Sequence, residues 1–474
     1  MNTRRPQITS ATAPPAALQS HELGSTDETI AVLRRTFDEL GDLFRIHVPS
    51  RGASTWVASH PDDVKHVLVT NHRNYTKGVG IDRGRLLLGN GIRTSEGECW
   101  RRQRRMMQPA FHRRVVERFA AIVREENESL GAAWSDAARG TGDVNVTLSV
   151  SRLALRVILR ALFDDDLRQL VPDLDRNPFA AILQDARRDT RFAYQFRQLA
   201  RGVRALVAVR RGRQQERFDL LQLLLEARDA DTGEVMSDAE VVDEVMTLVV
   251  AGHETTASTL NWTWWLLATH PDVAMRVADE QRTVGDLGHA SYADLIRLPY
   301  TRQVVDESMR LYPPGWLLTR RSVGPDTLGG HAVPAGTDVF ISPYLVHRHP
   351  RHWRLPGTFD PGHFDPPQVE ARHAFAYIPF AAGPRHCIGQ NFSLYEILLH
   401  FNYAVRRFEL ADPVTTGCCS SNTRMCTRWV GTATGPTCWQ VRTDSSSSAP
   451  PSSSSTGVGT SPTTVPVNWS DIRS

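Results

Sequence analysis

The chain has 474 residues, enough for one large domain or several ordinary ones. Hydrophobic residues make up 41% and charged residues 23%, proportions typical of a globular protein with a substantial core. The formal net charge of +3 is too close to balance to indicate nucleic acid or an anionic membrane as a partner, so we expect neither.

The first 30 residues are predicted to form a polar leader. They contain prolines and no apolar run that could serve as a signal peptide or membrane anchor, so we expect no anchor. The cysteines do not form a disulfide framework, because Cys99 and Cys387 lie far apart and the other four crowd the last segment. We therefore expect a monomer in the reducing cytoplasm.

Residues 31–410 alternate amphipathic helices with short extended stretches. The stretch "DETIAVLRRTFDELG" predicts a helix, "LFRIHVPSRGASTWVAS" a hairpin around a glycine turn, and "PDDVKHVLVT" a further helix. Longer helical patterns follow in "RRVVERFAAIVREENESLGAAWSDAA" and "LSVSRLALRVILRALF", and strand character returns in "DTLGGHAVPAGTDVFISPYLVH". The predicted fold is mainly α with a small β region.

The stretch "GECWRRQRRMMQPAFHRR" is a dense basic run on a predicted helix. Trp100 and Arg104 lie one helical turn apart, and the remaining arginines are Arg101, Arg102, Arg105, Arg113 and Arg114. Such a run is usually a solvated or nucleic-acid face, although the overall charge gives the latter little support. These arginines could also offer a positive surface to an acidic electron donor.

A single long helix is predicted over residues 237–271, where Ser237 and Glu240 form a capping box. Val242, Val245, Met246 and Val249 mark its apolar face. Its middle reads "AGHETT", which combines a glycine with paired threonines, all poor helix formers. This is either a tolerated kink or a distorted turn in which an acid and a hydroxyl hold water and relay protons.

The stretch "VVDESMRLYPP" places Glu307 and Arg310 three residues apart on one helix face. An isolated pair of this kind is usually a weak surface salt bridge. Further along, "FDPGHF" carries His363, whose charge can change near neutral pH.

The stretch "PFAAGPRHCIGQNF" places Cys387 in a turn of small residues before a long helical pattern. Gly383 and Gly389 allow a tight turn and close approach to a flat ligand. A cysteine at a helix N-terminus, next to Arg385, favours the thiolate. The competing interpretation is a buried, inert cysteine.

The spacing of Phe380, Gly383, Arg385, Cys387 and Gly389 resembles the haem-binding signature of the cytochrome P450 family, Phe-x-x-Gly-x-Arg-x-Cys-x-Gly. Ala381 departs from the glycine that the family often has beside this phenylalanine. The resemblance implies the triangular helical fold with a small sheet around one buried haem b (iron protoporphyrin IX). In a bacterial-type relative free in solution, Cys387 would be the axial thiolate on the iron.

The resemblance also implies roles for the other motifs. Thr255 would bind oxygen and water, and Glu254 would deliver protons. Phe380 would pack near the sulfur, and the haem propionates would be held by Arg385, Trp100, Arg104 and, as a weaker candidate, Arg321. Glu307 and Arg310 would form a buried structural triad with His363, which stands where the family usually has arginine and would make the triad pH-sensitive.

By resemblance, the chain is an O2-dependent monooxygenase that hydroxylates an apolar small molecule, guessed to be a fatty acid or terpenoid. Its electrons would come from NAD(P)H through separate proteins such as a ferredoxin and its reductase. The alternatives are a peroxygenase or isomerase, a non-catalytic haem-binding protein, and the inactive product of a damaged gene. Phe111, His253, Trp316 and Leu317 are candidate pocket-lining residues.

Two segments depart from the family. The lid region between "ALFDDD" and "FDLLQLLLEA" looks short. Residues 411–474 lose the leucine, phenylalanine, lysine and glutamate of the preceding chain and are rich in serine, which predicts a low-complexity, disordered tail or the translation of a shifted reading frame.

Overall fold

The structure is a computed structural model that describes residues 13–24, 26–140, 143–167, 190–212, 217–288, 290–410 and 439–443. The chain divides into a first compact unit, Met1–Thr443, and a second segment, Asp444–Ser474. The described residues all belong to the first unit.

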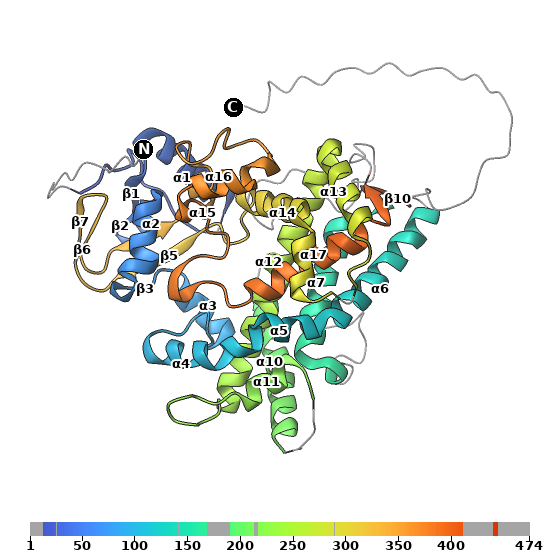
Figure 1. The fold of residues 1–474 in the computed structure, drawn as a ribbon. Coiled ribbons are helices and arrows are strands. Elements are labelled where there is room, and N and C mark those ends of the chain that lie inside the picture. Colours follow the sequence, from blue (N-terminus) through green and yellow to red (C-terminus); the bar gives the residue numbers. More distant parts are fainter. Residues whose placement is uncertain are drawn as a thin grey trace, which may run out of the picture. The chain divides into compact units, whose positions relative to one another are not determined.

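Helices dominate the described residues (Figure 1). The α-helices are α1 (Asp27–Leu40), α2 (Pro61–Lys65), α3 (Ile81–Leu88), α4 (Gly97–Met107), α5 (Arg113–Val116), α6 (Ala120–Arg139), α7 (Val146–Phe163), α10 (Thr190–Arg211), α11 (Leu220–Glu226), α12 (Asp238–Thr269), α13 (Pro271–Val284), α14 (Pro299–Leu311), α15 (Pro343–Val346), α16 (Pro366–Ala371) and α17 (Gln390–Ala404). The strands are β1 (Leu43–Val48), β2 (Ala53–Ala58), β3 (Tyr75–Lys77), β4 (Asp143–Val144), β5 (Leu318–Ser322), β6 (Asp326–Leu328), β7 (His331–Val333), β8 (Asp338–Ile341), β9 (Phe408–Leu410) and β10 (Trp439–Thr443).

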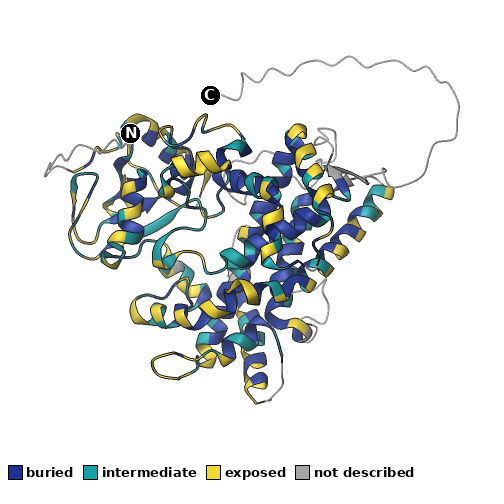
Figure 2. Cartoon of the chain, in the orientation of Figure 1, coloured by how far each residue is buried: buried dark blue, intermediate teal, exposed yellow. Residues whose placement is uncertain are grey.

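The central element is α12, a 32-residue helix that packs against α7, α10, α14 and α17. Its start is fixed as predicted, because the Ser237 side chain accepts the Glu240 N–H and the Glu240 carboxylate accepts the Ser237 N–H. The predicted apolar face is buried, with Val242, Val245, Met246 and Val249 at most 2% exposed. Figure 2 shows burial running along most of this helix, as expected for a helix enclosed by others.

The small β region forms around one five-stranded sheet in the order β1-β2-β8-β5-β3. The predicted hairpin is confirmed: Leu43 pairs with Ala58 and Val48 with Ala53, and Gly52 in the turn has a φ of 59°. Strand β5 pairs with β8 in antiparallel orientation. As in any strand, alternate residues of β5 face opposite sides of the sheet. This alternation decides which arginine of β5 reaches the candidate site.

Two predicted boundaries differ from the structure. Part of the predicted leader belongs to the fold, since the N–H of Ala17 donates to the Arg45 carbonyl (2.9 Å) and Glu22 binds Ser50. At the other end, β10 pairs with both β4 and β9, so the compact unit extends past Leu410 to Thr443. A short strand that depends on distant partners leaves too little local pattern to be predicted.

Candidate active site

The cysteine turn is held in shape by its own backbone. The N–H of Cys387 donates to the Phe380 carbonyl (2.9 Å), which closes the turn. Gly383 has a φ of 73°, and a Cβ there would overlap the Leu68 carbonyl of the neighbouring turn His66–Thr70. Only glycine satisfies both conditions. Ala381 also has a positive φ, 59°, a region that costs a residue with a Cβ about 1–2 kcal/mol.

The Cys387 sulfur receives donors from the start of α17. The N–H groups of Gly389 and Gln390 and the charge of Arg104 favour the thiolate, as predicted. Burial has the larger effect, however, and raises the pKa of Cys387 above its usual value. The predicted effect of the helix N-terminus is therefore present, but burial outweighs it. A bound metal cation would reverse the balance, because a coordinating thiol is deprotonated.

Cys387 lies inside the protein, where burial dominates its electrostatics. Part of its surface is nevertheless not covered by protein atoms. Thr255 is likewise exposed although it lies at the middle of the enclosed helix α12. The two helices concerned are joined nearby, since the hydroxyls of Thr256 on α12 and Ser393 on α17 lie 3.1 Å apart. Both candidate residues thus present surface that no protein atom covers.

The "AGHETT" stretch forms regular helix throughout, so the predicted distorted turn is not present. The Thr255 hydroxyl donates to the Ala251 carbonyl (2.7 Å), and Glu254 is half-buried. Gly252 serves packing, because a Cβ there would lie 2.9 Å from Cγ1 of Ile158 on α7. Back-bonding to the preceding turn lets threonine stay helical.

A cluster of cations lies beside the cysteine turn. Arg385 lies over the Trp100 ring (4.5 Å from Cζ to the centroid) and pairs with Glu96, but its Nη1 is buried with no hydrogen-bond partner. Lys77 donates to the carbonyls of Ile92 (2.9 Å) and Ser95 (2.7 Å). The cluster therefore offers donors to an anion that the protein itself does not supply.

The charges in this cluster are costly in the absence of an anion. Burial, together with the charge of Arg385, lowers the pKa of Lys77 to about 7. Burial also lowers the pKa of Arg320 to about 10, again with Arg385 contributing. Glu96 is the carboxylate that opposes both shifts. A carboxylate ligand would relieve this repulsion.

Arg321 is placed away from the cluster, which corrects its assignment as a propionate candidate. It makes two hydrogen bonds to Asp338 (2.8 and 2.9 Å), and its side chain is 49% exposed. Its neighbour Arg320, on the opposite face of β5, is buried. The alternation of faces along a strand could have separated Arg320 from Arg321, but the sequence does not show which of the two faces inward. Lys77 was also missed, although it is one of only two lysines in the chain.

Trp100 and Arg104 both lie on α4, as predicted. Arg104 donates from Nη1 to the His386 carbonyl (2.8 Å), and its Nη2 lies 3.1 Å from Nε2 of the same histidine. The side chain therefore reaches the residue next to Cys387 from a separate helix.

The predicted triad is assembled and buried. Arg310 donates to both oxygens of Glu307 (2.6 and 2.7 Å), and both side chains are 0% exposed. His363 Nδ1 lies 3.0 Å from Glu307 Oε1, and its Nε2 lies 2.6 Å from the Arg354 carbonyl. Arg310 also donates to the carbonyls of His347, Pro356 and Thr358. The triad thus joins α14 to the loops that follow α15.

The basic run on α4 is largely neutralised, which does not fit a free positive surface. Arg101 pairs with Glu98, Arg102 with Glu240 (2.7 Å) and Arg105 with Asp231 (2.8 Å). Arg113 lies over the Tyr292 ring (4.9 Å).

The candidate pocket-lining residues divide into two groups. Phe111 and His253 are buried, and burial lowers the pKa of His253 to about 4, so both belong to the core. Trp316 and Leu317 are half-buried and pack against the cluster that includes Phe37 and Phe340. The region predicted to be a short lid spans residues 167–217, of which 168–189 and 213–216 lie outside the described residues.

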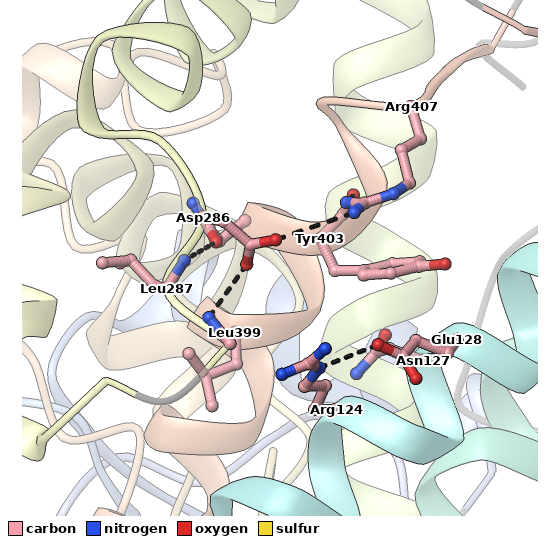
Figure 3. Close-up of a pocket in the computed structure, with 10 residues that line it drawn as sticks. Arg124, Asn127, Glu128, Asp286, Leu287, Leu399, Tyr403 and Arg407 are labelled. Atoms are coloured by element: carbon pink, nitrogen blue, oxygen red, sulfur yellow. Dashed lines mark hydrogen bonds and ion pairs between the residues drawn. The ribbon is translucent and has the colours of Figure 1, made fainter.

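A surface pocket lies elsewhere, between α6, α17 and the loop after α13 (Figure 3). Its walls carry the ion pairs of Arg124 with Glu128 (2.8 Å) and of Arg407 with Asp286 (3.7 Å). None of the predicted site residues lines it. The chemistry of the chain is therefore not assigned to this pocket.

The residues around Cys387 fit an iron porphyrin. Thiolate ligation of its iron needs a cysteine sulfur with open surface, and the porphyrin carries two carboxylates that require donors. Cys387 supplies the first, and the cluster of Arg385, Arg320 and Lys77, with its unpartnered buried nitrogen, suits the second. Among the described residues no group of three or more histidine, cysteine or acidic side chains could hold a metal ion.

The family is shown by comparison with known proteins. A model of the cytochrome P450 family matches residues 12–177 and 186–429, so the chain belongs to the cytochrome P450 family. It is an oxidoreductase of the haem-containing monooxygenase class.

Three relatives come from Streptomyces. Cyclooctatin synthase of Streptomyces melanosporofaciens is 35% identical, over 76% of this chain and 81% of that protein. Cyclooctat-9-en-7-ol 5-monooxygenase of the same organism is 34% identical, over 82% and 88%. Pentalenene oxygenase of Streptomyces avermitilis is 33% identical, over 76% and 82%.

A solved structure supports the same fold. The haem domain of cytochrome P450DA superposes with a TM-score of 0.79 at 26% identity, over 91% of this chain and 98% of that one. Across the part of the chain that is described, no helix has the length and apolar character to cross a membrane.

Proposed function

We propose that this P450 is a haem b monooxygenase that hydroxylates a largely hydrocarbon small molecule, a terpenoid in preference to a fatty acid. The observation that carries the proposal is the exposed surface of Cys387 inside the protein, next to a buried arginine nitrogen that has no partner. An inert structural cysteine would have its surface covered by protein atoms.

Cys387 would ligate the iron, and Arg385, Arg320, Lys77, Trp100 and Arg104 would hold the propionates. When bound, haem supplies the iron centre at which O2 is activated for insertion into a C–H bond. Thr255 would hold water with its exposed hydroxyl, and Glu254 would bring protons to it from one position earlier on α12. Phe380 would shield the sulfur from water.

The substrate class rests on the relatives. By their printed names, two of them act on an alkenol, cyclooctat-9-en-7-ol, and an alkene, pentalenene. Substrates of this kind bind mainly through apolar contact.

The electron donors would be separate proteins, a ferredoxin and an NAD(P)H-dependent reductase. Arg114, which is exposed near the paired arginines of α4, is the candidate contact for an acidic donor. We further propose a monomer in the cytoplasm, where the free thiols of Cys99 and Cys387 stay reduced.

The test is reconstitution with a bacterial ferredoxin, its reductase, NADPH and O2, with pentalenene and a medium-chain fatty acid as separate substrates. We expect a hydroxylated product from the alkene that depends on NADPH. In Thr255→Ala, NADPH consumption should continue while product per NADPH falls about tenfold or more, because proton delivery is disturbed. An equal yield per NADPH in the variant would contradict the role of Thr255.

The alternative peroxygenase function is separated by replacing the donors with hydrogen peroxide. Product from peroxide alone, with none from the NADPH system under several donor pairs, would favour the alternative. Product with NADPH excludes it as the main activity.

A further inference from the structure

Four histidines, none of them in the cysteine turn, gather around His352. His352 lies at the centre, with ring centroids 4.9 Å from His349, 6.0 Å from His60 and 6.2 Å from His373. They come from three separate parts of the chain: the residue before α2, the loop after α15 and the residue before the short helix η10 (Ala374–Ala376). The cluster therefore joins segments that are distant in sequence.

Three of the rings are fixed in one neutral form by backbone donors. Nδ1 of His60 accepts the Asp62 N–H (3.2 Å), and Nδ1 of His373 accepts the Phe375 N–H (3.1 Å). Nδ1 of His349 likewise accepts the Arg351 N–H (3.2 Å). A nitrogen that accepts must be unprotonated, so protonation of any of these rings removes a bond that starts a helix or turn.

Two acidic side chains and one arginine lie against these rings. Asp42 lies 3.0 Å from His349 Nε2 and also pairs with Arg351, while Asp62 lies 3.2 Å from His373 Nε2 and 3.6 Å from His60 Nδ1. Protonation would add up to four imidazolium charges beside the guanidinium of Arg351, and these charges repel one another within a few ångströms.

His352 is the ring least able to accept a proton. Its Nε2 is buried with no hydrogen-bond partner. Burial, with the charges of His349, His60, His373 and Arg351, lowers its pKa to about 4. A metal ion is not the explanation, because among the described residues no such group could hold one.

The histidine cluster is connected to the cysteine turn through α2 and η10. Helix α2 continues directly into the turn His66–Thr70, whose Leu68 carbonyl packs against Gly383. On the other side, η10 packs on α2 and leads through Ile378 to Phe380 and Cys387. A movement of α2 against η10 would shift the surface on which the cysteine turn rests.

We propose that His60, His349, His352 and His373 form a pH-sensitive latch that fixes α2 to η10 beneath the cysteine turn while the rings are neutral and releases it when they are protonated. Its effect on haem rests on the proposed function, whereas its effect on unfolding does not. The unfolded chain takes up the His352 proton near pH 6.5 and the folded chain only near pH 4, so stability is lost as pH falls through that window.

The test measures thermal unfolding and the reduced, carbon monoxide-bound spectrum of the haem-loaded full chain from pH 7.5 to 4.5. The double variant His60→Asn/His373→Asn keeps both backbone acceptors but cannot be protonated. His352→Phe removes the central group, and His47→Asn, an exposed histidine on β1, is the control.

We expect the double variant and His352→Phe to shift the acid midpoint of both signals downward by about half a pH unit or more, with the control unchanged. Equal midpoints in wild type, double variant and control would overturn the latch. If His352→Phe does not fold at pH 7.5, the double variant decides the outcome. A thiolate band absent at pH 7.5 in wild type contradicts the proposed function alone, since the unfolding signal still reports the latch.

Discussion

At the residue scale, prediction succeeded where chemistry is fixed by local spacing and failed where it depends on which face a residue takes. Gly383 could be identified because a tight turn needs glycine, whereas Cys387 as the haem ligand stays a prediction. Arg320 could not be separated from Arg321, because a shift of one residue in strand register exchanges their faces. Burial of Cys387, which reverses the expected thiolate preference, also has no signal in the sequence.

The Arg320 assignment predicts different outcomes for two neighbouring residues. Arg320→Gln should speed haem loss by about ten- to a hundredfold, because a charge-assisted bond to a propionate is worth about 1.5–3 kcal/mol. Arg321→Gln removes an exposed ion pair with Asp338 and should change the rate less than twofold. Transfer of haem to an excess of apomyoglobin measures both rates. Equal rates of haem loss in the two variants would contradict the assignment of Arg320, and not Arg321, to a propionate.

Ala381 predicts a stabilising substitution. Ala381→Gly removes the strain of a positive φ, and the greater freedom of glycine in the unfolded chain offsets part of the gain. We expect a net stabilisation of about 0.5 kcal/mol in thermal unfolding. Ala382→Gly is the matched control, because Ala382 is extended with a φ of −151° and should lose about 0.5–1 kcal/mol. A loss in both variants would show that Ala381 carries no strain.

At the element scale, long helices and the hairpin were predictable, and the contacts between elements were not. Helix α12 has a capping box and a long apolar pattern, so its start and extent follow from local rules. Its acidic residues have a second role that only the fold reveals: the N–H groups of Asn90 and Ile92 donate to Asp243 (2.7 Å) and Glu244 (2.9 Å). The loop before α4 is thereby attached to α12.

This attachment predicts a pH dependence. Burial raises the pKa of Glu244 from 4.5 to about 8. Between pH 4.5 and pH 8 the Glu244 carboxyl is therefore protonated in the folded protein and ionised in the unfolded chain. Stability from this group is present below pH 4.5 and is lost as pH rises to about 8. The free energy of unfolding of Glu244→Gln, relative to that of wild type, should therefore increase by a few kcal/mol from pH 5 to pH 8.5.

Thermal unfolding at both pH values measures this effect, with Glu39→Gln, exposed on α1, as the control. A wild-type to variant difference that stays constant between pH 5 and pH 8.5 would contradict a buried, protonated Glu244.

At the scale of the whole molecule, the family and the mainly helical fold with a small sheet were predicted from four motifs in order, and the comparisons confirm both. The limits of the compact unit were not predicted. Both ends are held by strand pairing, Ala17 to Arg45 and β10 to β9, and such pairing depends on distant residues. The triad of Glu307, Arg310 and His363 was expected from the resemblance to the family, because spacing alone favoured only a weak surface pair of Glu307 and Arg310.

The triad predicts a global effect on stability. Arg310→Lys cannot reproduce two bonds to Glu307 and three to backbone carbonyls, and it leaves a buried carboxylate poorly paired. We expect a loss of about 3 kcal/mol or more in urea unfolding. Arg282→Lys, in an exposed pair with Asp279 on α13, should change it by less than about 0.5 kcal/mol. Similar small losses in both would show that the triad does not secure the fold.

The most direct test of the central claim is the reduced, carbon monoxide-bound difference spectrum of the full-length protein beside Cys387→Ser. A Soret band strongly shifted to the red in the wild type and absent from the variant is the predicted result, since only a cysteine thiolate on the iron produces it. A band typical of a neutral ligand in the wild type, or the same band in both proteins, would contradict the assignment of Cys387 as the haem ligand and the monooxygenase function with it.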